Sequence, residues 1–157
     1  MLIALALALQ AVRLVLPLPQ PVSTFVIGSL VHMMLVLTWK LSGLGTALLL
    51  ALLLPLTAYL QGQVLLPLLI PVIWAGNVLF VVLLQLFSVN RRLALFLPPL
   101  AKAVLMGVAA WCVVNIVALP NPALRKTIMF GMSVPQLVTA FIGIWLARQV
   151  FLRIRKF

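Results

Sequence analysis

Apolar residues in this chain form six long runs, and short breaks of proline, glycine, amide or basic residues separate them. An α-helix needs roughly 20 consecutive apolar residues to cross a bilayer core about 30 Å thick. The pattern therefore predicts an all-α, polytopic membrane protein, folded as a compact bundle of six transmembrane helices in one domain over residues 1–157. The expected helices cover about residues 2–16, 22–39, 44–60, 65–87, 93–119 and 128–152.

The first run is short, and the prolines Pro17, Pro19 and Pro21 follow it. A secretory signal peptide has a similar length, but it begins with basic residues and ends at a small-residue cleavage site. Here Arg13 lies at the far end of the run, and prolines occupy the position of a cleavage site. We therefore expect a helix of the mature protein.

Composition restricts both the solvent and the chemistry. Hydrophobic residues make up 66% of the chain, no residue is Asp or Glu, and Lys plus Arg number 11. A soluble protein of this composition would expose an unbroken apolar surface. Without carboxylates, and with a single histidine and a single cysteine, the chain has no acid–base pair and no cluster of metal ligands. The sequence predicts a protein that is not an enzyme and has no catalytic residue, metal or cofactor.

The positive charge lies mainly at the ends of the apolar runs, which indicates topology and contact with anionic membrane lipids rather than a nucleic-acid partner. If both termini are cytoplasmic, seven basic residues lie at inner helix ends and three at outer ends. This distribution satisfies the positive-inside rule, so we expect both termini inside the cell. The inner group is Lys40, Arg91, Arg92, Arg148, Arg153, Arg155 and Lys156, and the outer group is Arg13, Arg125 and Lys126.

Polar and aromatic residues near the outer ends of the third, fourth and last helices are candidates for a binding site. Tyr59 and Gln63 lie at the end of the third helix, and Trp74 and Asn77 follow in the fourth. Asn77 lies deep in an apolar span, where its amide must bond to another helix, to water or to a ligand. Gln136 lies about two turns into the last helix.

Three basic residues and one histidine have two interpretations each. Lys102 is the one cation well inside a span, and it can either reach toward the lipid interface or contact a ligand or lipid within the bundle. Arg13 and Arg125 can face an anionic solute or lipid head groups. For His32 we favour a hydrogen-bonding group in the core over a metal ligand.

Small residues at helical spacing indicate where another helix can approach. Ala4 and Ala8 lie four apart, on one face of the first helix. Packing within the bundle and docking of a partner both explain this pattern.

Several motifs occur together along nearly the whole chain. They are the Ala4/Ala8 helix with its proline-bearing loop, the turn Ser42-Gly43-Leu44-Gly45, the segment Leu54-Pro55-Leu56-Thr57-Ala58 ending in Gln61-Gly62-Gln63, the Pro67/Pro71 stretch before Gly76-Asn77, and Pro135-Gln136-Leu137-Val138-Thr139-Ala140. This combination resembles the substrate-binding S components of energy-coupling factor (ECF) vitamin transporters.

The resemblance implies a multi-pass protein of the bacterial cytoplasmic membrane that binds a small vitamin-like nutrient near its outer face. It implies docking through Ala4 and Ala8 onto a membrane T component with two cytoplasmic ATPase subunits. Because the chain has no acidic residue, we expect a neutral or anionic nutrient rather than a cation. The expected substrate-binding residues are Tyr59, Gln63, Trp74, Asn77, Gln136 and Arg125.

An alternative function is a non-transporting membrane scaffold of the rod-shape MreD-like type, which has a similar size and helix count. A small lipid-handling enzyme is a third possibility, which the missing carboxylates disfavour. In a transporter subunit, the polar residues within the membrane should converge on one outward cavity, whereas in a scaffold they should be scattered among helix contacts. Asn77, Gln63, Gln136 and Trp74 are the residues that distinguish the two.

Overall fold

The computed structural model of this chain describes residues 1–15, 19–64, 66–118 and 120–154. These residues form helices joined by short connections, and no strand occurs among them, so the predicted all-α class is confirmed. The helices are α1 (Leu2–Val15), α2 (Gln20–Ser42), α3 (Leu44–Leu60), α4 (Leu69–Leu86), α5 (Arg91–Ile116), α6 (Pro122–Gly131) and α7 (Val134–Ile154).

Four stretches of the described chain are long and apolar enough to cross a membrane. They are Val22–Ser42 in α2, Leu69–Leu86 in α4, Arg92–Ile116 in α5 and Pro122–Ile154 over α6 and α7. The apolar helices α1 and α3 are shorter, with 14 and 17 residues. At 1.5 Å per residue they extend about 21 Å and about 26 Å. This composition and these lengths are those of a membrane-embedded protein.

Three of the predicted helix bounds differ from the structure for identifiable reasons. α2 begins at Gln20, with a proline in its first turn, where the missing N–H interrupts no helical hydrogen bond. α4 begins at Leu69 after a turn in which Leu69 N–H donates to the Leu66 carbonyl. The last apolar run is divided at Met132 and Ser133 into the short α6 and the long α7.

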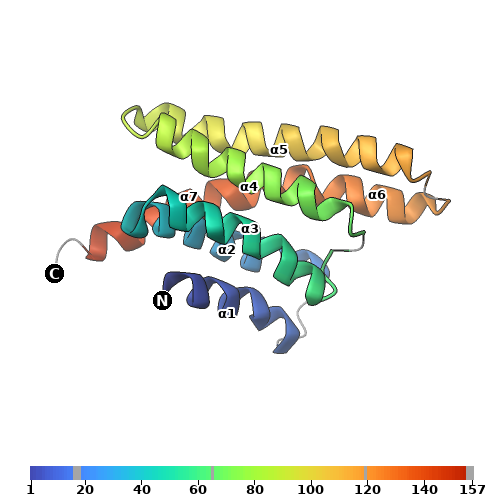
Figure 1. Cartoon of the computed structure of the whole chain (residues 1–157), viewed down its shortest axis with the longest axis horizontal. Coiled ribbons are helices and arrows are strands. Elements are labelled where there is room, and N and C mark those ends of the chain that lie inside the picture. The colour runs from blue at the N-terminus through green and yellow to red at the C-terminus, as the bar shows by residue number, and fades with distance from the viewer. Residues whose placement is uncertain (16–18, 65, 119, 155–157) are drawn as a thin grey trace.

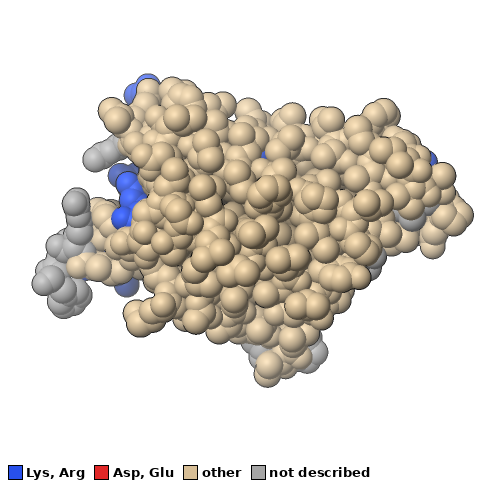
Figure 2. All heavy atoms as spheres, in the orientation of Figure 1, with Lys and Arg blue, Asp and Glu red and all other residues tan. Residues whose placement is uncertain are grey.

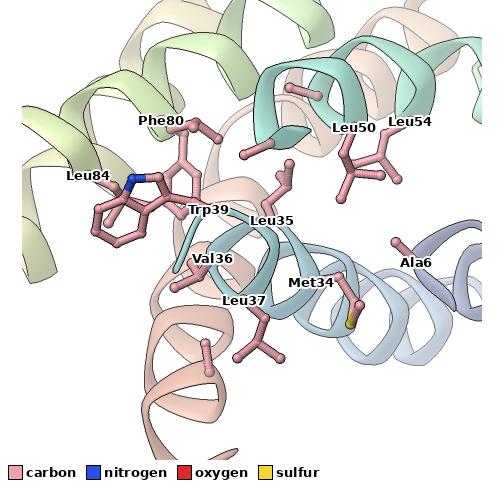
Figure 3. Close-up of a cluster of buried hydrophobic side chains, with 14 of the residues drawn as sticks. Ala6, Met34, Leu35, Val36, Leu37, Trp39, Leu50, Leu54, Phe80 and Leu84 are labelled. Carbon is pink, nitrogen blue, oxygen red and sulfur yellow. The ribbon is translucent and has the colours of Figure 1, made fainter. Parts of the chain in front are cut away.

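The helices lie roughly along one direction, with α1 at one edge, α4 and α5 at the opposite edge, and α2, α3 and α7 between them (Figure 1). α2 contacts α1, α3, α4 and α7. Its segment from Met34 to Trp39 is buried without interruption, and side chains of α1, α3 and α4 gather around it (Figure 3). Trp39 Nε1 donates to Gln85 Oε1 of α4 at 2.7 Å, which adds a polar contact to this apolar core.

The first helix begins and the last helix ends toward the same end of the bundle (Figure 1). Basic side chains gather at that end, and the rest of the visible surface is almost free of charge (Figure 2). The end of α2 with Lys40, the start of α5 with Arg92 and the end of α7 with Arg153 all lie toward this end of the bundle (Figure 1). Large apolar side chains such as Phe96 and Trp111 are exposed on the sides, as expected for a surface that faces lipid.

Candidate functional site

A cavity of about 690 Å³ lies inside the bundle and extends to the end where α1 terminates and α3 connects to α4. Small-molecule sites in proteins typically have volumes of about 300–1,000 Å³, with mostly apolar walls and a few polar groups. The polar groups here form two sets. We call His32, Asn77 and Lys102 the inner cluster, and Arg13, Gln61 and Gln63 the mouth cluster.

The inner cluster is a chain of hydrogen bonds across three helices. Lys102 Nζ of α5 donates to Asn77 Oδ1 of α4 at 2.6 Å and lies 2.6 Å from His32 Nε2 of α2. His32 Nδ1 lies 2.7 Å from the Gly28 carbonyl oxygen, which can only accept a hydrogen bond. Nδ1 therefore carries the imidazole proton, and Nε2 is left to accept from Lys102.

A proline in α3 explains how Asn77 is satisfied at this depth. Pro55 lies inside α3 and has no N–H, so the carbonyl of Ala51, four residues earlier, loses its helical partner. Asn77 Nδ2 donates to that carbonyl oxygen at 3.5 Å. The proline thus frees an acceptor at the point where the amide of α4 needs one, and the same amide orients its Oδ1 toward Lys102.

All three side chains of the inner cluster are buried, and Lys102 is only 1% exposed. The Lys102 side chain therefore points into the bundle and does not reach toward the lipid interface. Phe80 contributes an apolar wall: its ring packs edge-on against His32 at 5.4 Å and lies 5.7 Å from Lys102 Nζ. The chain contains no Asp or Glu, and the two hydrogen-bond partners of Lys102 in the described chain, His32 and Asn77, are a neutral imidazole and a neutral amide.

Glycines bring the helices of the inner cluster unusually close together. A Cβ added at Gly143 of α7 would lie 2.4 Å from His32 Cβ and 2.8 Å from the backbone nitrogen of Met33. A Cβ added at Gly76 of α4 would lie 2.6 Å from Met106 Cγ and 3.5 Å from Lys102 Cγ. The two glycines therefore fix the positions from which His32 and Lys102 reach into the cavity.

The mouth cluster joins three segments that are distant in sequence. Arg13 Nε of α1 donates to Ser23 Oγ at 2.5 Å, and its two terminal nitrogens donate to Thr24 Oγ1 and Gln63 Oε1 at 3.2 Å each. Gln63 Nε2 in turn donates to Gln61 Oε1 at 2.5 Å. Arg13 thus connects the end of α1 to the start of α2 and to the loop between α3 and α4.

A second contact fixes α1 against α3 below the mouth. Gln10 is buried, and its Nε2 donates to the Leu54 carbonyl at 3.1 Å, while its Oε1 accepts from Thr57 Oγ1 at 3.2 Å. Gln10 and Arg13 lie three apart and share one face of α1, and both line the cavity. Gln10 is not among the residues predicted from the sequence, although the spacing of two polar residues in an apolar helix is a usable signal.

Of the six residues predicted to bind substrate, Gln63, Asn77 and Gln136 line the cavity. Tyr59 and Trp74 do not line it, and Trp74 is 42% exposed on the surface of α4. Arg125 is exposed on α6 and donates to Asn115 Oδ1. His32, Lys102 and Arg13, which are not among these six, also line the cavity. His32 is buried and hydrogen-bonded, as expected for a core group.

The predicted docking residues lie outside the cavity. Ala4 and Ala8 are exposed on α1, whereas Ala6 and Gln10 on the same helix are buried against the bundle. α1 therefore presents Ala4 and Ala8, beside the larger Leu5 and Val12, on a face that no other described helix covers.

Comparison with known proteins gives no match: no family model, no curated protein and no solved structure corresponds to this chain. The cavity, its two polar clusters and the open face of α1 are the features that bear on function.

Proposed function

We propose that this chain is the substrate-binding membrane subunit of an ATP-driven importer of the ECF type. It captures a small, vitamin-like nutrient from the outer face and has no catalytic activity of its own. In this proposal it spans the bacterial cytoplasmic membrane six times with both termini inside. A T component and two ATPase subunits complete the importer.

One observation carries the proposal: polar residues from five helices converge on a single cavity inside an apolar bundle. Gln10, His32, Asn77, Lys102 and Gln136 come from α1, α2, α4, α5 and α7, and all of them line it. Hydrogen bonds within the bundle pair these groups, as any buried polar group requires. A scaffold needs such pairs at its helix contacts but has no need to arrange them around an open volume. A ligand-binding protein does need them there.

The direction of the cavity supports uptake from outside. The mouth cluster and the basic helix ends of Lys40, Arg92 and Arg153 lie at opposite ends of the bundle. By the positive-inside rule, the basic end is the cytoplasmic one. The mouth then faces the outer leaflet, where a nutrient would enter.

The exposed face of α1 supports docking on a membrane partner. Within a bilayer, helices associate most closely where small side chains allow their backbones to approach. Ala4 and Ala8 supply such a face, and it lies apart from the cavity. Substrate capture and attachment to an energy-supplying module can therefore occur together.

The test is co-purification from native membranes in mild detergent. We expect the wild type to retain a membrane subunit and ATPases, and the Ala4→Trp/Ala8→Trp variant to lose both. Val104→Trp is the control, because Val104 is exposed on α5, which lies at the opposite edge of the bundle from α1 (Figure 1). If no ATPase accompanies the wild type, the importer proposal fails and a scaffold becomes the better explanation.

A further inference from the structure

The cavity has a defined length and a graded chemistry. Thr24, Gly28 and His32 follow one another at four-residue spacing along α2, and all three line it. Leu69, Ile73 and Asn77 form a matching stripe along α4. Eight residues of helix measure about 12 Å, so each stripe runs about 12 Å from the mouth to the inner cluster. The walls between the two clusters are mainly apolar.

The inner cluster lacks a negative charge. An ammonium group has three N–H donors. The His32 and Asn77 contacts of Lys102 use two of them, which leaves one for a ligand in the cavity that Lys102 lines. No Asp or Glu exists anywhere in the sequence to act as a counter-ion. No side chain of this sequence can supply an opposite charge, so an anionic ligand is the partner that would stabilise the charged form of Lys102.

The depth of Lys102 identifies the kind of ligand. Lys102 lies 11 residues from the start of α5 and 14 from its end, so it is about 16 Å and about 21 Å from the two ends of the helix. A phospholipid whose head group stays at the bilayer surface does not reach this depth. A small solute that enters the cavity does.

We propose that the cavity binds a small amphiphilic monocarboxylate, with its carboxylate on Lys102 and its apolar body between the α2 and α4 stripes. His32 and Asn77 hold the Lys102 amine in place, and the mouth cluster covers the other end of the ligand. A single cation at the inner end favours a single negative charge. This inference rests on the proposed binding function and narrows it from a neutral or anionic nutrient to a carboxylate.

The probe is octanoate, compared with octanamide, which has the same chain length and no charge. The intact protein is placed in phosphatidylcholine nanodiscs, and its thermal unfolding midpoint is measured against probe concentration. We expect octanoate to raise the unfolding midpoint. Octanamide should need at least a tenfold higher concentration for the same shift, since it cannot form the charge-assisted bond to Lys102. Equal responses to the two probes would overturn the proposal.

Two variants separate the Lys102 contact from partitioning of octanoate into the lipid. Lys102→Met should lose the preference for octanoate over octanamide, whereas Lys126→Met, at an exposed lysine outside the cavity, should keep it.

Asn77→Asp would place a carboxylate beside Lys102 and provide an internal counter-ion. That variant should fold with a higher midpoint and no longer respond to octanoate, which a purely structural role of Asn77 does not predict. If Lys102→Met does not fold, the octanoate response of Asn77→Asp tests the Lys102 contact in its place.

A second set of nanodiscs containing phosphatidylglycerol identifies the source of the anion. If phosphatidylglycerol raises the wild-type midpoint through Lys102 and octanoate has no effect, the inner cluster binds a lipid and the proposal is wrong. The octanoate experiment and the co-purification experiment test the two proposals separately. Octanoate binding without co-purifying ATPases would refute only the importer, and ATPases without octanoate binding would refute only the carboxylate.

Discussion

Replacing Gly143 with alanine should push α7 away from α2 and disturb the inner cluster. The added Cβ would lie 2.4 Å from His32 Cβ, 2.8 Å from Met33 N and 3.0 Å from the His32 carbonyl carbon. Two of these are backbone atoms, which cannot rotate out of the way as a flexible side chain can. The helices themselves must separate, and His32 moves with α2.

Gly107 provides a matched control for the magnitude. Both glycines lie inside helices, where alanine is favoured over glycine by about 0.8–1 kcal/mol. At Gly107 the nearest atom to a new Cβ would be Ser133 Cβ at 3.7 Å, an ordinary contact. The helix-propensity term is common to both variants, so their difference in stability isolates the clash. Overpacking of this kind costs about 1–3 kcal/mol.

The assay is thermal unfolding of the purified proteins in one detergent, followed by circular dichroism. For a chain of this length, 1 kcal/mol corresponds to about 2–4 °C, so Gly143→Ala should unfold roughly 2–12 °C below Gly107→Ala. Gly143→Ala should also bind octanoate more weakly than Gly107→Ala, because His32 no longer holds the Lys102 amine. Equal midpoints for the two variants would refute the close approach of α2 and α7.

Three further predictions use the same unfolding assay. Thr38 is fully buried, and its Oγ1 has no hydrogen-bond partner among the described residues, so Thr38→Val should raise stability by about 1 kcal/mol; a lower midpoint would contradict this. A double-mutant cycle of Trp39→Phe and Gln85→Leu should give a coupling energy of about 0.5–1.5 kcal/mol for the 2.7 Å bond, and simple additivity would count against that bond. Gly62 has a φ of 69°, so Gly62→Ala should lower stability by about 1–2 kcal/mol, whereas Gly45→Ala, in the first turn of α3 with no atom near its new Cβ, should not. Identical midpoints for those two alanine variants would argue against the left-handed turn.

The sequence predicted most of the helices because long apolar runs and their breaks are strong signals. The predicted start of the last helix at residue 128 was wrong. The structure begins α6 earlier, since the Asn121 side chain accepts from the backbone N–H groups of Ala123 and Leu124 and Pro122 fits the first turn. At the exposed end of the bundle, charged residues on a helix meet no apolar core, so they do not interrupt it.

The site was only partly predictable, because hydrogen-bond partners depend on which helices are neighbours. Asn77 could be singled out, since an amide in an apolar span must be paired. Its partner could not, because the free Ala51 carbonyl matters only once α3 packs beside α4. Trp74 is one residue beyond Ile73, about 100° around the helix, and this offset moves it from the cavity stripe to the exposed surface.

Lys102 shows why hydropathy alone could not orient α5. In a soluble protein, polar residues mark the outer face of a helix, but lipid is as apolar as the core, so both faces of α5 carry apolar residues. The exposed face includes Val104 and Val108, and the buried face continues from Lys102 through Met106 and Ala110 at four-residue spacing. Within the bilayer the polar residue itself marks the interior, because only there can other polar groups reach it. By that reasoning, the buried Lys102 indicates the face of α5 that points toward the cavity.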